Sequence, residues 1–182
     1  MAKKSKRTLR LIRFQREVEC CVEKDGRYVL SDYAEARVSH IHGRGVFATE
    51  RIPRGMRIIE YVGEKISKTE AVRRSNIGHA VYIFDLNARV DIDGAVGGNG
   101  AHLMNHSCEP NAESEWDDNH VYIVARRSIK PGEEITYNYG FDENDYECYP
   151  CSCGSSKCRG YMLSDEAWRK VKRKLNGNGR RG

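Results

Sequence analysis

Residues 105–111 read NHSCEPN and residues 132–139 read GEEITYNY, and these two segments decide how the whole chain is interpreted. The second begins at a turn, Lys130-Pro131-Gly132, and continues as a run typical of a β-strand. The first places a cysteine, Cys108, within a polar stretch. A strand tyrosine such as Tyr139 is by itself more often half-buried packing than a catalytic group. Both segments therefore have to be weighed with the residues around them.

A cluster of cysteines follows the second segment. Cys151, Cys153 and Cys158 have the spacing C-x-C-x4-C, in a chain with seven cysteines and no secretion signal. Such a chain is expected to use its cysteines for metal rather than for disulfides. Three thiolates on one small loop suit tetrahedral Zn²⁺, and a structural zinc site needs a fourth protein ligand. The candidates for that ligand are Cys20, Cys21, Cys108 and Cys148. The alternative is a reduced loop without metal.

Length and hydropathy limit the class of protein. The chain has 182 residues, a mass of 20.8 kDa and a mean hydropathy of -0.71, which suit one domain with its own core. It contains no apolar run close to the roughly 20 residues of a membrane span. Residues 1–16 lack the apolar stretch and the cleavage site of a secretory signal. We therefore expect an intracellular monomer with no membrane partner, nuclear or chromosomal in a eukaryote and cytoplasmic or nucleoid-associated in a bacterium.

The charge is divided between the ends and the middle of the chain. Residues 1–16 and 167–182 each contain seven Lys or Arg and no acid, so residues 17–166 carry a net charge of about -9 within a total of +5. An acidic body attracts cationic peptides, and basic ends suit contact with the phosphates of nucleic acid. The alternative is that the ends are solvated tails that only aid solubility.

The pattern of residues predicts a mainly β domain with short helices. The β-type runs are Ala36–Ile41, Val46–Thr49, Arg57–Glu64, Ala80–Leu86, Arg89–Ile92, Ala112–Trp116, Val121–Arg126 and Glu134–Tyr139. Asp117-Asp118-Asn119 is predicted to be a hairpin loop. Ser67 and Glu70 have the spacing of a helix capping box. Ser164 begins a second predicted helix, acidic first and basic last, that ends before Gly177.

Five elements in their order resemble the SET-domain lysine methyltransferases. NHSCEPN and GEEITYNY resemble the two signatures of that family. His42–Phe47 resembles its Gly-x-Gly cofactor turn, Ile59–Glu64 the strand after the turn, and the three later cysteines with Arg159 its post-SET motif. The resemblance covers Arg37–Leu163, about 70% of the chain, and is nearest to the trithorax-like and Set-one-like branch.

The resemblance implies a division of the chain and a fold. It implies a basic extension (1–35), a SET domain (36–141), a post-SET zinc segment (142–163) and a basic C-terminal helix and tail (164–182). The implied fold is a β-clip in which one signature threads through a loop made by the other, a pseudoknot that is rare among folds.

The resemblance also implies the ligands. Cys108 is implied to join Cys151, Cys153 and Cys158 around a structural zinc ion, which leaves Cys20, Cys21 and Cys148 as free thiols. The residues implied to bind S-adenosylmethionine are His42, Gly43, Arg44, Gly45, Tyr82, Asn105, His106 and Ser152. Ser152 departs from relatives that often have Asn at this place, and Asn138 departs from relatives that often have Asp.

Four tyrosines are implied to form the channel for the substrate lysine: Tyr61, Tyr82, Tyr137 and Tyr139. Tyr139 matches the catalytic tyrosine, whose hydroxyl orients the amine and whose ring faces the sulfonium cation. Burial in an aromatic channel favours the neutral form of lysine, which is the form that accepts a methyl group. Tyr137 stands at the position where relatives have Phe or Tyr, and Tyr implies mono- or dimethylation.

Two other classes compete with an enzyme. A SET-like module could bind peptide or nucleic acid without catalysis, but the loss of Tyr139 or Asn105 expected of it is not seen. A zinc-ribbon nucleic-acid binder needs paired CxxC knuckles or an aromatic stacking surface, and the sequence shows neither. We therefore expect a lysine methyltransferase acting on a basic tail, such as that of a histone, a histone-like DNA-binding protein or a ribosomal protein.

Overall fold

Three small β-sheets make up most of the computed structural model, which describes residues 22–24, 27–144 and 146–178. The largest has the order β1-β2-β3-β4-β12-β9, formed by Val22–Lys24, Arg27–Ser31, Ala34–Val38, Arg44–Ala48, Glu134–Tyr137 and Asn105–His106. The second has the order β10-β11-β5, formed by Ala112–Asp117, His120–Ala125 and Arg57–Glu60. The third has the order β6-β8-β7, formed by Glu64–Ser67, Val90–Asp93 and Ile83–Asp85. This confirms the mainly β prediction.

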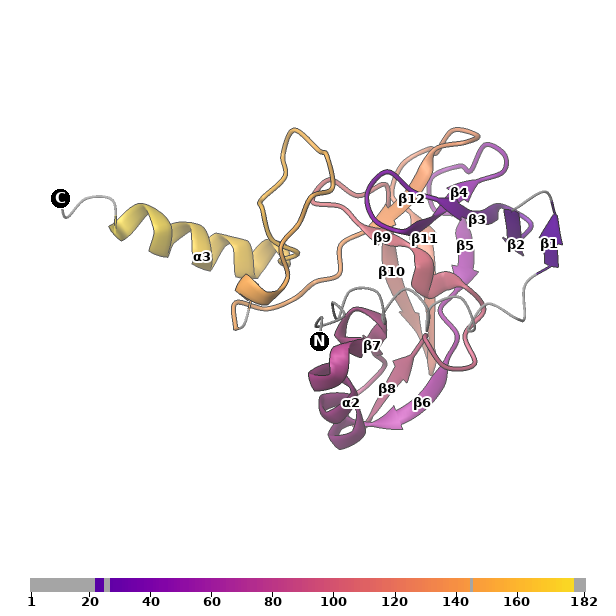
Figure 1. The fold of residues 1–182 in the computed structure, drawn as a ribbon. Helices are drawn as coiled ribbons and strands as arrows, with labels where there is room; N and C mark the ends of the chain where they lie inside the picture. The colour runs from indigo at the N-terminus through magenta and orange to yellow at the C-terminus, as the bar shows by residue number, and fades with distance from the viewer. Residues whose placement is uncertain (1–21, 25–26, 145, 179–182) are drawn as a thin grey trace, which may run out of the picture.

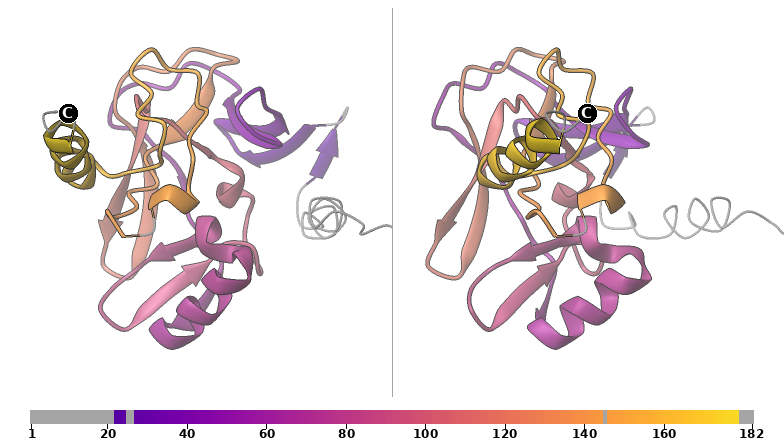
Figure 2. Two further views of the ribbon diagram at one scale, coloured as in Figure 1. Left: turned by 60° about the vertical axis from the view of Figure 1, so that its left-hand side comes forward. Right: turned by 90° about the vertical axis from the view of Figure 1, so that its left-hand side faces the viewer.

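Two α-helices lie outside the sheets (Figures 1 and 2). Helix α2, Lys68–Arg74, lies beside the third sheet, and helix α3, Asp165–Asn178, extends away from all three. Short helical turns occupy Ser75–His79, Ala80–Tyr82, Ala101–Leu103 and Tyr146–Cys148. Among the described residues, no helix is long and apolar enough to cross a membrane.

The three sheets share one core. Its buried side chains come from every sheet: Ala36, Val46 and Ile135 from the first, Val121 and Ile123 from the second, and Ile92 from the third. A separate small cluster joins α3 to the chain before it, where Leu163, Ala167 and Val171 pack against Tyr146, Tyr161 and Trp168. The C-terminal segment therefore has its own minor core rather than a share of the main one.

Several predicted local features are confirmed. The Ser67 hydroxyl caps α2 by accepting a hydrogen bond from the Glu70 backbone N–H at 3.3 Å, as the capping-box spacing predicted. Asp118 and Asn119 form the turn between β10 and β11, where Asp117 pairs with His120. Asp118 has a φ of 53°, a left-handed conformation that Asp tolerates better than most residues.

Other boundaries were wrong. The predicted run 57–64 is divided between β5 and β6, because the chain passes from the second sheet to the third. At this crossing a Cβ on Gly63 would lie 2.3 Å from the Asp93 carbonyl oxygen, so glycine allows the backbones to meet. The run 80–86 begins as a helical turn, and α3 continues through Gly177. Strands β1 and β2 were not predicted, because residues 1–35 were assigned as a whole to a basic N-terminal extension.

Candidate functional site

The segments NHSCEPN (105–111) and GEEITYNY (132–139) lie side by side at the centre of the molecule (Figure 1). Strands β9 and β12 pair in parallel, with Thr136 opposite Asn105 and Tyr137 opposite His106. Beyond the end of β12, the Tyr139 backbone N–H donates to His106 Nδ1 at 3.1 Å. Desolvation, with a smaller contribution from the Arg159 charge, lowers the pKa of His106 to about 4. His106 is therefore neutral at pH 7, with its proton on Nε2.

The four predicted tyrosines gather around this pairing. The rings of Tyr137 and Tyr139 are 5.1 Å apart between centroids. The Tyr139 hydroxyl donates to the Met104 carbonyl at 2.8 Å, and the Tyr61 hydroxyl donates to the Tyr82 carbonyl at 2.8 Å. Burial raises the pKa values of Tyr61, Tyr137 and Tyr139 well above the usual value of tyrosine. These phenols are therefore neutral hydrogen-bond donors rather than bases at any ordinary pH.

A pocket of about 250 Å³ opens against two of these tyrosines. Its lining includes Phe84, Asp85, Trp116, Tyr137, Tyr139 and Phe141. Phe84 stacks on Tyr137 with centroids 5.9 Å apart and also contacts Tyr61 at 4.9 Å. The Trp116 indole N–H donates to the Asp85 carbonyl at 2.9 Å, which fixes this ring at the rim. The result is a hollow with five aromatic side chains in its lining, including Tyr137 and Tyr139.

A second arrangement forms around the loop before β4. The Asn105 side-chain amide lies 3.2 Å from the His42 carbonyl, 3.0 Å from the Arg44 carbonyl and 2.8 Å from Glu134 Oε1. A Cβ on Gly45 would lie 2.2 Å from the same Glu134 oxygen. Gly45 is therefore required for Glu134 and Asn105 to hold the loop in this position.

Arg44 carries an unsatisfied donor in this loop. Its guanidinium lies 4.3 Å from the centroid of the Tyr28 ring, and its Nη1 atom is buried with no hydrogen-bond partner among the described residues. A buried cationic donor without an acceptor is costly unless an anion binds it. His42 and Ser152, in contrast, are exposed, and neither side chain makes a hydrogen bond within the described part of the chain.

Tyr82 is fixed through its backbone. Its carbonyl accepts from the Tyr61 hydroxyl and, at 2.9 Å, from the Gly94 N–H. The strand before Gly94 is tied to α2, because Arg74 donates to the fully buried Asp93 carboxylate at 2.8 Å. The ring of His102 meets Tyr82 edge-on, with centroids 5.9 Å apart.

The four predicted thiols come together. The sulfur atoms of Cys108, Cys151, Cys153 and Cys158 all lie within 4.8 Å of one another. Those of Cys108 and Cys151 are 3.7 Å apart, close to the edge of about 3.8 Å that a tetrahedron with zinc–sulfur bonds of about 2.3 Å requires. Cys148 is exposed and outside the cluster, and Cys20 and Cys21 lie outside the described residues. This donor set fits a closed structural zinc site.

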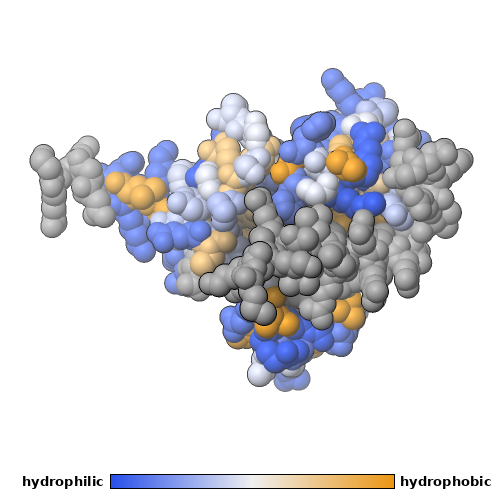
Figure 3. Space-filling view, viewed as in Figure 1, coloured by the Kyte–Doolittle hydropathy of each residue, from blue (hydrophilic) through white to orange (hydrophobic). Residues whose placement is uncertain are grey.

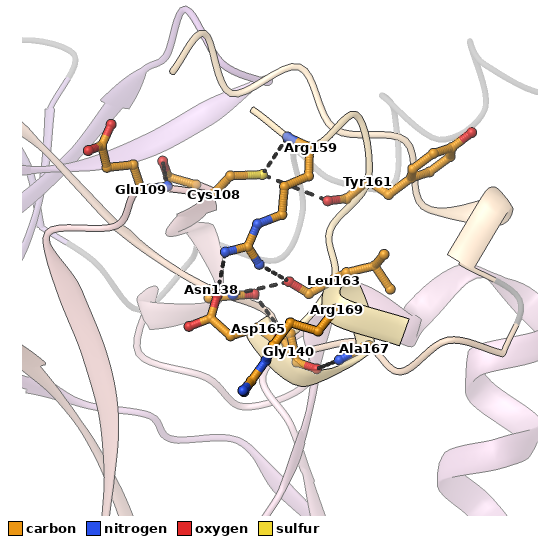
Figure 4. Close-up of polar contacts among 12 residues, drawn as sticks. Cys108, Glu109, Asn138, Gly140, Arg159, Tyr161, Leu163, Asp165, Ala167 and Arg169 are labelled. Carbon is orange, nitrogen blue, oxygen red and sulfur yellow. Dashed lines mark hydrogen bonds and ion pairs between the residues drawn. The ribbon is translucent and has the colours of Figure 1, made fainter. Parts of the chain in front are cut away.

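Arg159 ties the cysteine segment to the end of the second signature (Figure 4). Its guanidinium donates to the Leu163 carbonyl at 3.2 Å and pairs with Asp165 at the start of α3. The Asn138 side chain donates to the same carbonyl at 3.1 Å. The Arg159 backbone N–H points to the Cys108 sulfur at 3.4 Å. Arg159 thus contacts the thiol cluster and α3, and it shares the Leu163 carbonyl with Asn138 of the second signature.

Comparison with known proteins gives this arrangement a family. A model described as SET domain matches residues 43–140, from the Gly-x-Gly turn to the residue after Tyr139. The chain belongs to the SET domain family.

Relatives of this SET domain are large proteins. "Histone-lysine N-methyltransferase trithorax" of Drosophila virilis is 42% identical over 139 residues, which are 72% of this chain and 4% of that protein. "Histone-lysine N-methyltransferase TRX1" of Oryza sativa is 40% identical over 71% of this chain and 14% of its own length. "Histone-lysine N-methyltransferase 2D" of Homo sapiens is 37% identical over 68% of this chain and 2% of its own length. The chain therefore spans a small part of the relatives it matches.

The site also contains residues that were not predicted from the sequence. Phe84, Trp116 and Phe141 line the pocket, and Glu134 holds the loop before β4. Phe84 and Trp116 belong to predicted strands, but no spacing indicated that these strands would meet over Tyr137. Glu134 was quoted within the second signature, yet its contact with Gly45 depends on the pairing of β4 and β12.

Proposed function

We propose that this chain transfers a methyl group from S-adenosylmethionine to the side-chain nitrogen of a lysine in a basic protein, with histones as the substrate class. The observation that carries the proposal is the aromatic pocket that ends at Tyr137 and Tyr139. Three further facts support it: the chain belongs to the SET domain family, its relatives are named histone-lysine N-methyltransferases, and residues 17–166 carry a net charge of about -9 that attracts basic tails.

The loop around Arg44 fits the co-substrate. The buried Nη1 atom of Arg44 lacks an acceptor among the described residues, and the carboxylate of the methionine moiety can supply one. Gly43, with a φ of 49°, and Gly45 let the backbone approach a ligand closely. We assign the other contacts to His42, Tyr82, Asn105, His106 and Ser152. When bound, S-adenosylmethionine supplies a methyl group activated by a positively charged sulfur.

The pocket side chains prepare the lysine. A free lysine has a pKa of about 10.4, and an aromatic site that excludes water lowers this value, so the neutral amine is favoured. The three buried phenols stay protonated, since their pKa values are raised, so none of them takes the proton, and lysine loses it to solvent before it enters the site. The lone pair of the neutral amine then forms the N–C bond while the S–C bond breaks and its electron pair passes to sulfur, so that the neutral thioether S-adenosylhomocysteine leaves. The product ammonium loses a proton to water.

Tyr139 aligns the reacting groups. Its hydroxyl is fixed on the Met104 carbonyl, and its ring is held edge-on by His106 at a centroid distance of 5.4 Å. A fixed aromatic face stabilises a nearby cation, and alignment of the amine contributes a large share of the rate. Tyr137 occupies space beside the amine, so we propose that transfer stops after one or two methyl groups.

Zinc has a structural role in this proposal. Cys108, Cys151, Cys153 and Cys158 would hold it with no position open for substrate. Through Cys108 the ion would attach the C-terminal segment to the signature that contains Asn105 and His106. In a eukaryotic cell the substrate class places the protein on chromatin.

The test is methyl transfer from labelled S-adenosylmethionine to core histones and ribosomal proteins by the zinc-loaded full chain. We expect label on lysine, lost by at least about 100-fold in Tyr139→Phe, because alignment effects of this kind have that magnitude. Tyr122→Phe is the matched control, since the Tyr122 ring belongs to the second sheet and does not line the pocket. It packs against Arg57, with 4.2 Å between the guanidinium and the ring centroid. Binding of S-adenosylmethionine without transfer to any protein of the panel would contradict the proposal and favour a silent binding module.

A further inference from the structure

Helix α3 carries a basic face that the proposed reaction does not use. Its apolar side, formed by Ala167 and Val171, packs against Leu163, Tyr146 and Tyr161. Arg169, Lys172 and Arg173 are exposed, and at 100° per residue they lie on the side opposite Ala167 and Val171. We call these three residues the α3 basic face. Figure 1 shows α3 extending away from the sheets, and Figure 3 shows hydrophilic residues along it together with a hydrophobic patch near its C-terminal end.

The acids near this face are already neutralised. Asp165, at the start of the helix, pairs with Arg159, and Glu166 pairs with Lys170 at 3.2 Å. Glu143 also pairs with Lys170, at 2.9 Å, and feels the charge of Lys174. Within the described part of the chain, no member of the α3 basic face has an ion pair with a carboxylate. On the flank that contains Lys170 and Lys174, acidic and basic charges therefore offset one another. The α3 basic face keeps its positive charge uncompensated.

The two arginines of the face present free donors. Arg169 uses its Nε atom on the Asp165 carbonyl at 3.1 Å, and Arg173 uses its Nε atom on the Arg169 carbonyl at 3.2 Å. Their terminal nitrogens have no hydrogen bond among the described residues. One helical turn, about 6 Å along the axis, separates the two guanidinium groups. Guanidinium groups oriented in this way can donate two parallel hydrogen bonds to the oxygens of a phosphate group.

We propose that the α3 basic face docks on the phosphate backbone of duplex nucleic acid. A membrane surface fits less well, because a helix that lies on lipid needs a continuous apolar face to insert, and on α3 Ala167 and Val171 are packed within the protein, which leaves Leu175 as its exposed large hydrophobic side chain. An acidic protein partner fits less well because a stable protein interface has an apolar centre, whereas this face has only charged side chains. Contact with the phosphates of nucleic acid requires only cations in a fixed row. It also makes the affinity fall as the salt concentration rises.

The test compares two double variants that remove the same charge. Arg169→Gln/Arg173→Gln removes charge from the basic face, and Lys170→Gln/Lys174→Gln removes charge from the balanced flank. Binding of the full zinc-loaded chain to a labelled 20-base-pair duplex (a length of about two helical turns) is measured by fluorescence anisotropy over a series of salt concentrations. The circular dichroism of each variant checks that α3 is intact.

We expect the face variant to bind about tenfold more weakly near 0.1 M salt, with a slope of log K against log salt reduced by about 2, since each phosphate contact contributes about 0.9. The flank variant should stay within about twofold of the parent. Equal weakening by both variants, or no binding by the parent chain, would overturn the proposal. So would binding to anionic vesicles in place of the duplex. Methyl transfer to a free peptide is a separate readout, because neither variant touches the pocket.

Discussion

The β9–β12 centre and the C-terminal segment are held in different ways. The centre, from Asn105 to Tyr139, is fixed by strand pairing and by buried side chains such as Asn105 and His106, which bond to parts of the backbone that the fold itself positions. The segment 141–163 joins the body through a few polar contacts, such as that of the Asn138 amide with the Leu163 carbonyl and that of Lys157 with Glu109, and through the Cys108 thiol, which lies among the three thiols of the segment. The centre is therefore fixed by its own strand pairing and hydrogen bonds, whereas we propose that the C-terminal segment depends on a metal.

Loss of the metal should have the largest effect. We expect Cys151→Ser, or treatment with a chelator, to reduce methyl transfer by about 100-fold or more. The segment 141–163 would lose its attachment beside the pocket, and a shift of about 1 Å in the position of reacting groups reduces the rate by about that factor. Far-ultraviolet circular dichroism should change little, since the sheets do not contain the thiols. Cys148→Ser is the control, and equal loss of activity in it would contradict the comparison.

Breaking the centre should instead reduce stability. Asn105→Ala removes the amide that bonds to the His42 and Arg44 carbonyls and to Glu134. We expect the free energy of unfolding to fall by about 3 kcal/mol, because buried acceptors lose their partner. Denaturant titration with and without zinc measures this change. A fall that appears only in the zinc-loaded protein would show that the two regions are not independent.

Acid should weaken the fold at His102, in the helical turn just before the centre. Burial lowers the pKa of His102 from the usual histidine value of 6.5 to about 4. The unfolded chain therefore binds a proton first as the pH falls, so this neutral histidine contributes stability above pH 6.5 that is lost progressively towards pH 4. The loss should reach about 3 kcal/mol, at 1.36 kcal/mol for each pKa unit. His102→Gln should flatten the stability profile, and His40→Gln, a substitution at an exposed histidine, is the matched control.

The smallest effect should come from the link between the two regions. Asn138→Asp removes the amide that donates to the Leu163 carbonyl but keeps the oxygen that accepts from the Gly140 N–H. We expect a loss of about 1 kcal/mol or less, since Arg159 still binds the Leu163 carbonyl and the new carboxylate would lie near its guanidinium. Thermal unfolding measures it. A loss as large as that of Asn105→Ala would show that the C-terminal segment is held by Asn138 rather than by zinc.

The parts of the site that the sequence predicted are those that carry their chemistry in a short pattern. The spacing of Cys151, Cys153 and Cys158 indicated a metal loop, while the choice of Cys108 as the fourth thiol needed the family resemblance. The structure brings these four thiols and the four tyrosines together. Local signals such as the Ser67 cap and the Asp118 turn were also sufficient.

What the sequence did not predict depends on contacts between distant strands. Phe84 and Trp116 meet over the pocket because β7 and β10 belong to different sheets that pack together, and no local period encodes that approach. The division of residues 57–64 depends on Gly63 facing Asp93, which is also a tertiary contact. The continuation of α3 through Gly177 shows that a glycine alone does not end a helix.

The most direct measurement is the mass spectrum of a core histone after incubation with the zinc-loaded chain and S-adenosylmethionine. The account predicts a lysine that gains one or two methyl groups, no gain with Tyr139→Phe, and a third methyl group with Tyr137→Phe. A histone of unchanged mass, after binding of S-adenosylmethionine has been confirmed, would contradict it.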